Sequence, residues 1–150
     1  MASTHRPVLL STVASDSHTW NLVYLQLLVT ELGWHVVNLG PCVPDGTLLD
    51  ASQRHHPALV LITTVNGHGA EDGERLIRRL RAEPVLASTP VVIGGKLGID
   101  GEEGARLRAQ RLLRAGFTAV LEGPGAVPRL RSLLGELRSQ TGLAARDRAA

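Results

Sequence analysis

The stretch A-L-V-L-I-T-T-V, residues 58–65, decides the fold because it is a nearly continuous apolar run bounded by Pro57 and Asn66. A strand with one face in water alternates apolar and polar residues, whereas a strand covered on both faces stays apolar along its length. The run is the most hydrophobic segment of the chain. It therefore predicts a central strand of a parallel sheet that has helices on both faces.

Similar but shorter apolar runs alternate with amphipathic segments on either side of this strand. The other predicted strands span residues 8–15, 35–39, 90–94 and 119–121, and the predicted helices span residues 22–32, 48–56, 71–82, 104–115 and 127–140. Asn21 is the expected N-cap of the first helix and Gly33 the residue just beyond its end. This alternation predicts βαβ units with right-handed crossovers.

The expected architecture is a single doubly wound α/β domain of the flavodoxin-like or Rossmann-like kind, with five parallel strands in the order 2-1-3-4-5. The length of 150 residues is that of one domain. The predicted domain covers residues 7–140, between an N-terminal tail of residues 1–6 and a flexible C-terminal tail of residues 141–150.

Composition excludes several classes of function. Aromatic residues make up only 3% of the chain, so the core must be aliphatic, and the net charge of +2 comes without a basic block interleaved with aromatics. Nucleic acid is therefore not an expected partner. No apolar run reaches the roughly 18 residues of a membrane span, and the N-terminus lacks the pattern of a signal peptide. The lone Cys42 cannot form an internal disulfide, fits a cytoplasmic protein, and is expected to be a small buried residue.

The loops that follow the strands carry the candidate site. In the predicted strand order the topological switch point lies between the first and third strands, where open α/β sheets bind ligands outside the carboxyl ends of the strands. These loops are small and polar, which leaves an edge that a large flat ligand can approach closely. They read S-D-S-H-T-W-N (15–21), T-T-V-N-G-H-G (63–69), G-G-K-L-G (94–98) and E-G-P-G (122–125).

Asp16 and His18 are the strongest candidates for a metal-binding pair in these loops. A neutral imidazole is the commonest protein ligand of metals, and a carboxylate or carbonyl usually holds the nitrogen that is not bound to the metal. The alternative is that the two residues only cap and solvate a loop. Their position after the first strand, at the switch point, favours the metal-ligand interpretation.

The residues at these positions resemble the signatures of the cobalamin-binding domain family. Asp16-Ser17-His18-Thr19-Trp20-Asn21 resembles Asp-x-His-x-x-Gly, and Thr63-Thr64-Val65 resembles the Ser-x-Leu that ends the third strand. Gly94-Gly95 and Gly123-Pro124-Gly125 are similar to the later glycine motifs. The resemblance covers residues 7–138 and is greatest to the small, sigma-type subunits of glutamate (methylaspartate) mutases.

This resemblance implies a cofactor, a partner and a set of roles. The cofactor would be adenosylcobalamin with its benzimidazole displaced, His18 would be the axial cobalt ligand, and Asp16 would hold the other imidazole nitrogen. The partner would be a large TIM-barrel mutase subunit in a hetero-oligomer that isomerises L-glutamate to 3-methylaspartate, and this chain would be inactive alone, with no catalytic residue beyond His18 and Asp16. The displaced tail would lie between the sheet and the first helix. The implied cofactor-binding residues are Ser15, Asp16, Ser17, His18, Thr19, Thr63, Thr64, Val65, Gly94, Gly95, Lys96, Leu97 and Gly98.

Two positions depart from the family pattern, and two other functions stay open. Asn21 stands where the family has glycine, and Trp20 has no counterpart in the signature. A corrinoid-carrying module of a methyltransfer or regulatory system shares the Asp-x-His motif. A phosphoacceptor signalling domain shares the fold but needs an aspartate at the end of the third strand, where this chain has Thr63-Thr64-Val65.

Overall fold

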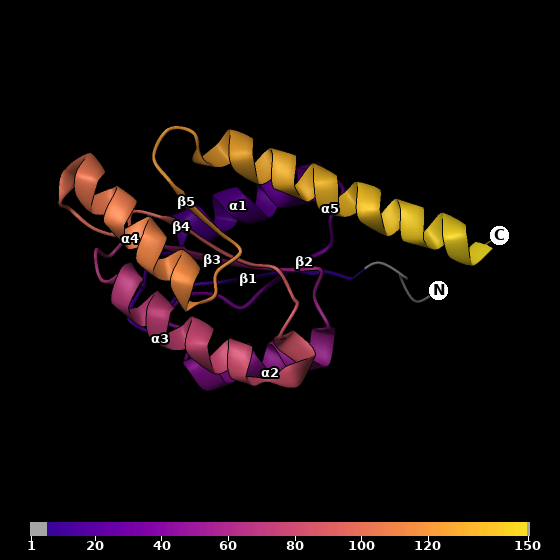
Figure 1. Cartoon of the computed structure of the whole chain (residues 1–150), viewed down its shortest axis with the longest axis horizontal. Helices are drawn as coiled ribbons and strands as arrows, with labels where there is room; N and C mark the ends of the chain where they lie inside the picture. The colour runs from indigo at the N-terminus through magenta and orange to yellow at the C-terminus, as the bar shows by residue number, and fades with distance from the viewer. Residues whose placement is uncertain (1–5, 150) are drawn as a thin grey trace.

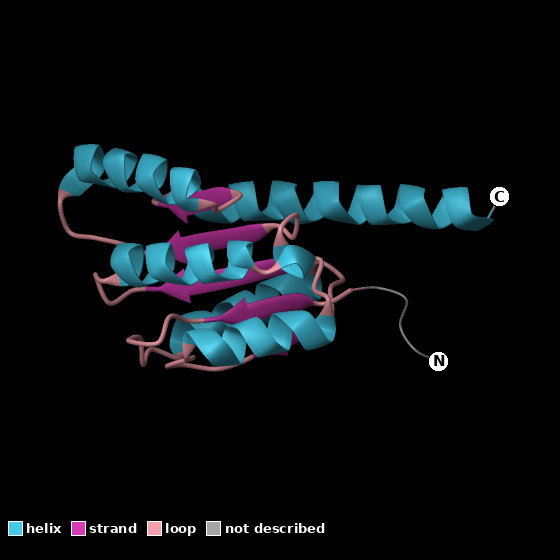
Figure 2. Ribbon diagram, turned by 60° about the horizontal axis from the view of Figure 1, so that its bottom comes forward, coloured by secondary structure: helices cyan, strands magenta, loops and turns pink. Residues whose placement is uncertain are grey.

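The protein is a three-layer α/β sandwich, described by a computed structural model that covers the backbone of residues 6–149 and the side chains of residues 6–140. The five strands form one parallel sheet in the order β2-β1-β3-β4-β5, as predicted (Figure 1, Figure 2). The elements are β1 (Val8–Ser11), α1 (Trp20–Glu31), β2 (Val36–Asn38), α2 (Asp45–His55), β3 (Leu59–Thr64), α3 (Gly69–Ala82), η1 (Pro84–Leu86), β4 (Val91–Gly95), α4 (Gly101–Ala115), β5 (Ala119–Glu122) and α5 (Ala126–Ala149).

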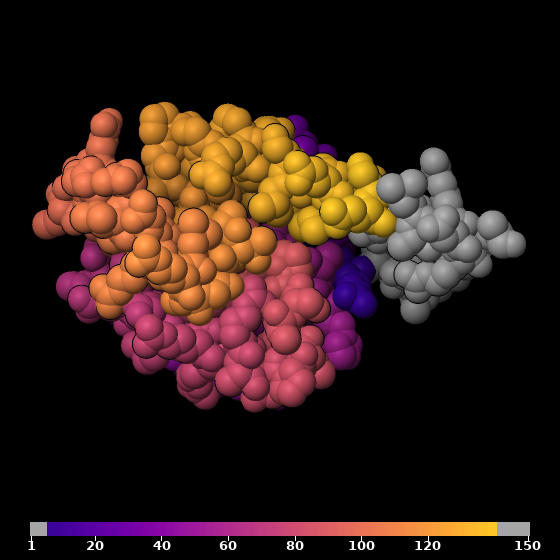
Figure 3. All heavy atoms as spheres, in the orientation of Figure 1, coloured from indigo at the N-terminus to yellow at the C-terminus, as the bar shows by residue number. Residues whose placement is uncertain are grey.

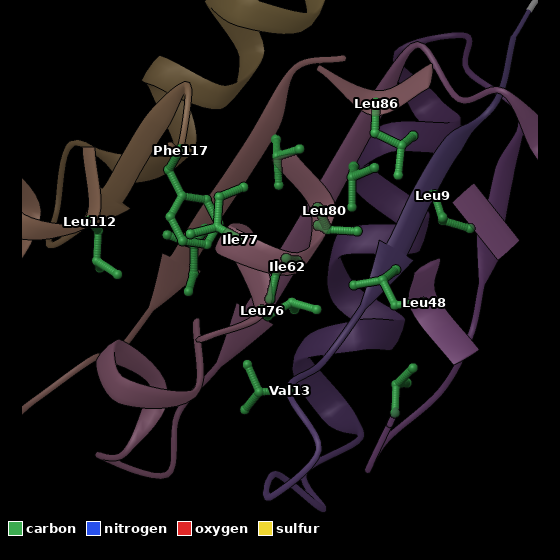
Figure 4. Packing of buried hydrophobic residues seen from close by; sticks show 14 of the residues in the cluster. Leu9, Val13, Leu48, Ile62, Leu76, Ile77, Leu80, Leu86, Leu112 and Phe117 are labelled. Atoms are coloured by element: carbon green, nitrogen blue, oxygen red, sulfur yellow. The ribbon is translucent and has the colours of Figure 1, made fainter. Parts of the chain in front are cut away.

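The continuous apolar character of β3 follows from burial on both faces. Every residue of this strand is buried, and its neighbours are β1 and β4. Leu59 and Leu61 belong to the core under α1 and α5, whereas Val60 and Ile62 belong to the core under α2, α3 and α4. The second of these cores is built from aliphatic side chains and Phe117 (Figure 4). The low aromatic content therefore does not prevent close packing.

Several element boundaries differ from the predictions, and two of the differences bear on the site. β1 ends at Ser11 instead of residue 15 because a turn follows, in which the Asp16 N–H donates to the Val13 carbonyl at 3.1 Å. The predicted N-cap role of Asn21 is wrong, since α1 begins at Trp20 and Thr19 holds the cap position. Asn21 is instead a buried residue of the first helical turn. Gly33 lies just beyond the end of the helix with a φ of +92°, as expected of a residue at that position.

The last helix also runs further than predicted. α5 continues to Ala149 instead of ending near residue 140, and it extends past the sheet (Figure 2). Up to residue 140, α5 lies along the domain (Figure 3) and buries Leu130 and Leu134 against it. The predicted tail of residues 1–6 lies outside the described residues except for Arg6, and the flexibility expected for residues 141–150 stays a prediction. Among the described residues, no helix has the length and apolarity needed to cross a membrane.

Candidate functional site

The Asp16 carboxylate organises the loop after β1. Its side chain is fully buried, and Oδ2 accepts hydrogen bonds from the Thr64 hydroxyl and the Val65 N–H, both at 2.7 Å. Oδ1 accepts from the His18 N–H at 2.9 Å and lies 2.7 Å from His18 Nδ1. Burial raises the pKa of this carboxyl, but the hydrogen bonds from Thr64, His18 and Val65 together hold it below its ordinary value. The ionised carboxylate is therefore the stable form.

His18 is held at one nitrogen and open at the other. Because an ionised carboxylate only accepts hydrogen bonds, Nδ1 carries the proton toward Asp16, so in the neutral imidazole the lone pair is on Nε2. The side chain is 47% exposed, and no described residue bonds Nε2. This is the arrangement of a metal-ligating imidazole whose orientation is fixed by an outer carboxylate.

Among the described residues, His18 is not joined by other metal-ligating side chains. No cluster of three or more His, Cys, Asp or Glu side chains able to hold a metal occurs among residues 6–140. A metal held by one imidazole alone would be weakly bound. The described residues therefore offer a metal at this place one protein ligand, His18 Nε2.

An apolar cavity of about 200 Å³ lies beside this loop, between the sheet and helices α1 and α5. An apolar cavity of about 150 Å³ accommodates benzene, so this one can hold a single flat aromatic group. Its lining includes the polar side chains of Thr63 and Asn21, which are hydrogen-bonded to each other. The other lining residues are Trp20, Tyr24, Leu25, Leu61, Ile62, Val65, Gly94, Gly95, Leu121, Ala126, Val127 and Leu130.

Gly94 and Gly95 lie at the floor of the cavity, at two positions where a larger residue would not fit. A Cβ at Gly94 would lie 2.8 Å from the Leu121 carbonyl oxygen, and a Cβ at Gly95 would lie 2.1 Å from that of Thr64. Gly95 also has a φ of +115°, which side chains rarely adopt. The pair lets three strand ends converge, because Gly94 and Gly95 are in register with Thr63 and Thr64 of β3 and with Leu121 and Glu122 of β5.

Gly95→Ala is expected to lower the free energy of unfolding by about 2 kcal/mol, because it combines a strained φ with a backbone clash. Urea denaturation measures the change. Gly46→Ala is the matched control: Gly46 lies in α2 with nothing within 4 Å of its Cβ position, and this change should stabilise the helix by up to about 1 kcal/mol. Equal stability of Gly95→Ala and the wild type would contradict the role given to Gly95.

The structure brings together only some of the predicted cofactor-binding residues. Thr63, Val65, Gly94 and Gly95 line the cavity, whereas Ser17, His18 and Thr19 are exposed in the loop that precedes the lining residue Trp20. Thr64 points to the opposite face of the sheet and bonds Asp16.

Ser15 and the segment after β4 lie away from the cavity. Ser15 bonds Asn66 at 2.8 Å and also contacts Asp72 of α3. The expectation that Lys96, Leu97 and Gly98 continue the cavity lining is not met. Leu97 packs into the core under α3 and α4, and its N–H donates to the Glu122 carboxylate at 3.1 Å. Lys96 is exposed, and Gly98 lines a separate hollow with His68.

Other features of the site were not foreseen from the sequence. The cavity walls from α1 and α5 include Tyr24, Leu25 and Leu130, which helical spacing from Asn21 and Ala126 could have indicated. Cys42 is exposed instead of buried, and it has a left-handed backbone conformation with a φ of +50°. Its N–H donates to the Asp16 carbonyl at 2.7 Å, so the loop before α2 also supports the loop of His18.

Comparison with known proteins agrees with this geometry. A family model described as "B12 binding domain" matches residues 6–131. The chain belongs to the B12-binding domain family. It is 32% identical to a glutamate mutase sigma subunit of Halobacterium salinarum over 80% of this chain and 78% of that relative. It is 24% identical to one of Fusobacterium nucleatum, over 80% of this chain and 86% of that relative.

Solved structures show the same fold. A cobalamin-binding protein from Desulfitobacterium hafniense superimposes with a TM-score of 0.70 at 19% identity, over 89% of this chain and 60% of that one. The receiver domain of a Francisella response regulator superimposes with a TM-score of 0.64 at 18% identity, over 90% of this chain and 98% of that one. At these identities the likeness concerns the fold alone, and the site residues distinguish the two kinds of domain.

Proposed function

We propose that this B12-binding chain is the cofactor-carrying subunit of an adenosylcobalamin-dependent carbon-skeleton mutase that acts on L-glutamate to give 3-methylaspartate. The observation that carries the proposal is the His18 imidazole, with Nδ1 fixed by buried Asp16 and Nε2 open to solvent. Relatives named as glutamate mutase sigma subunits support the choice of reaction.

The residues present fit the proposed cofactor. His18 Nε2 would hold the cobalt, and the apolar cavity under α1 and α5 would hold the cofactor's own base. Thr63 offers its hydroxyl inside the cavity, and the glycines at positions 94 and 95 let the tail lie against bare backbone. Bound adenosylcobalamin supplies radical chemistry, while the protein binds and orients it.

The role of Asp16 is to fix the imidazole. Its hydrogen bond with Nδ1 holds the tautomer in which Nε2 is free to bind a metal. Because Thr64 and Val65 hold Asp16 from β3, the ligand loop is tied directly to the central strand of the sheet. The imidazole therefore sits on a rigid support.

A reconstitution experiment tests the reaction. The full chain is mixed with a candidate large mutase subunit, adenosylcobalamin and L-glutamate, and 3-methylaspartate is measured. Product should form only when both chains and the cofactor are present, since the described residues include no barrel that could enclose a substrate. Preferential binding of methylcobalamin, with no product, would favour a methyltransfer or regulatory module instead.

An exposed apolar stripe on α1 is the proposed contact with the large TIM-barrel subunit of a hetero-oligomer. Trp20, Val23, Tyr24 and Leu27 are 66%, 56%, 49% and 66% exposed, and their spacing puts them on one face of the helix. Contiguous exposed apolar patches of this kind mark interaction sites. The stripe begins two residues after His18, so a partner bound there would also cover the cofactor.

Leu27→Glu is expected to weaken binding of the large subunit about 10-fold or more, because it places a charge in an apolar interface. Analytical ultracentrifugation of the two subunits measures the affinity. Val85→Glu is the matched control: Val85 is 59% exposed but lies in η1, whose Leu86 packs in the core on the face of the sheet opposite to α1. Equal affinities of the two variants would contradict the assignment of the stripe.

A further inference from the structure

The loop of His18 has a second anchor, which lies on α3. Ser15 directly precedes Asp16, and its hydroxyl accepts a hydrogen bond from Asn66 Nδ2 at 2.8 Å. The same hydroxyl donates to the Asp72 carboxylate in the first turn of α3. Because a carboxylate accepts hydrogen bonds and an amide nitrogen donates them, the direction of both bonds is fixed. Ser15 is thus bonded on both sides by residues that follow β3.

Both partners of Ser15 are held in turn by other groups. The Asn66 side-chain oxygen accepts the backbone N–H of the residue two positions later at 2.9 Å, which turns Nδ2 toward Ser15. Asp72 accepts from Arg75 Nη1 at 3.0 Å, and Arg75 Nε donates to Asp45 at the start of α2, also at 3.0 Å. The Asp45 and Asp72 side chains are only 9% and 17% exposed. The anchor therefore extends from the loop across α3 to α2.

The two anchors hold adjacent residues of the loop from different layers of the domain. β3 and the residue after it hold Asp16 through two hydrogen bonds, whereas Asp72 holds Ser15 from a helix. One anchor leaves a loop free to pivot about it, but two anchors on adjacent residues also fix its direction. Because Asp16 carries the His18 ring, the direction of the loop is also the direction of the imidazole.

The stability of the fold is a weak explanation for this anchor. Ser15 is exposed, and a hydrogen bond at an exposed site contributes little to the free energy of unfolding because water replaces it. A metal–ligand distance, by contrast, tolerates changes of only about 0.2 Å. A small shift of the loop therefore matters more for a bond to a metal than for the packing of the domain.

We propose that Ser15, held by Asp72, is a positioning residue that sets how His18 Nε2 approaches the cobalt. The described partners of the Ser15 hydroxyl are Asn66 and Asp72, so it acts on the imidazole through the loop and not by contact with the ring. This role differs from the direct cofactor contact that the sequence led us to expect for Ser15. The proposal rests on the proposed function, since the cobalt is the one that His18 would bind.

Ser15→Ala and Asp72→Ala test the anchor from its two ends. Each should weaken the binding of adenosylcobalamin to the full chain about 5-fold, which is less than the roughly 10- to 100-fold cost of losing a direct outer-shell partner. Equilibrium dialysis measures the affinity. Ser15→Thr keeps the hydroxyl and should restore the wild-type affinity. Full affinity in Ser15→Ala overturns the proposal, and so does an equal loss in Ser15→Thr.

Glu71→Ala is the matched control for Asp72→Ala. Glu71 is the other acidic residue in the first turn of α3, it is exposed, and no described residue bonds its carboxylate. Both changes remove the same charge from the start of the helix, but only Asp72→Ala removes the contact with Ser15. Glu71→Ala should bind the cofactor as the wild type does. An equal loss in the two variants would assign the effect to the charge at the start of α3 and overturn the role of the contact.

A double-mutant cycle separates the positioning of His18 from a general effect on the fold. In the His18→Ala background there is no imidazole to position, so the addition of Ser15→Ala should cause no further loss of affinity. A general disturbance of the loop would weaken binding by the same factor in both backgrounds, and that result would overturn the proposal. Thermal unfolding of each chain without cofactor checks that the variants are folded.

The failure of this proposal can be told apart from the failure of the proposed function. A wild type that binds the cofactor through His18, with equally tight binding by Ser15→Ala, overturns the positioning role alone. A wild type that does not bind adenosylcobalamin, or that binds it no more tightly than His18→Ala does, overturns the proposed function as well.

Discussion

His18→Ala is expected to bind cobalamin more than about 100-fold more weakly than the wild type, because loss of an outer-shell partner alone costs roughly 10- to 100-fold. The variant should fold normally, since the side chain is 47% exposed and makes one hydrogen bond, to Asp16. Equilibrium dialysis with the cofactor measures the affinity, and thermal unfolding checks the fold.

His68→Ala is the matched control for this change. His68 is exposed and lies at the same edge of the sheet, but it holds the cap position of α3 and lines the separate hollow with Gly98. It should bind cobalamin as the wild type does. Unchanged affinity in His18→Ala, or an equal loss in both variants, would remove the basis for a specific axial ligand.

Asp16→Ala is expected to be the most destabilising single change at the site, with a loss of about 3 kcal/mol in the free energy of unfolding. It leaves the Thr64 hydroxyl, the Val65 N–H and the His18 N–H without their buried acceptor. For a chain of this length, such a loss lowers the melting temperature by roughly 6–12 °C. Calorimetry of the chain without cofactor measures it.

Asp50→Ala is the control for the loss of a carboxylate. Asp50 is 70% exposed on α2 and makes a single ion pair, with Arg54 at 3.6 Å. Exposed pairs contribute little, so this variant should stay within about 0.5 kcal/mol of the wild type. If Asp16→Ala were equally harmless, the Asp16 carboxylate could not be the group that ties the loop of His18 to β3.

The sequence was sufficient to predict the sheet and the pairing of Asp16 with His18. The parallel strands followed from apolar runs separated by helices, and their order followed from right-handed crossovers in a doubly wound sheet. The short Asp-x-His spacing allowed a local contact between the carboxylate and the ring. Both features depend on residues near one another in the chain.

The parts that could not be predicted depend on which face a residue takes near the end of an element. β3 places Thr63 in the cavity and Thr64 against Asp16, so two adjacent threonines have different roles. Asn21 was expected at a helix cap, but a start of α1 at Trp20 turns it inward to Thr63. Leu97 was expected in the cavity, but the bend at Gly95 sends it to the opposite core. Shifts of one or two residues in an element boundary decided each case.

The most direct test of the central claim is the electron paramagnetic resonance spectrum of the cob(II)alamin form bound to the full chain. Histidine labelled with the heavier nitrogen isotope is incorporated into the wild type and His18→Ala. Ligation by His18 predicts that the axial nitrogen splitting changes with the label in the wild type and that His18→Ala shows no label-dependent splitting. A splitting that is unaffected by the label in the wild type would show that the cofactor keeps its own base on cobalt, and would contradict the account.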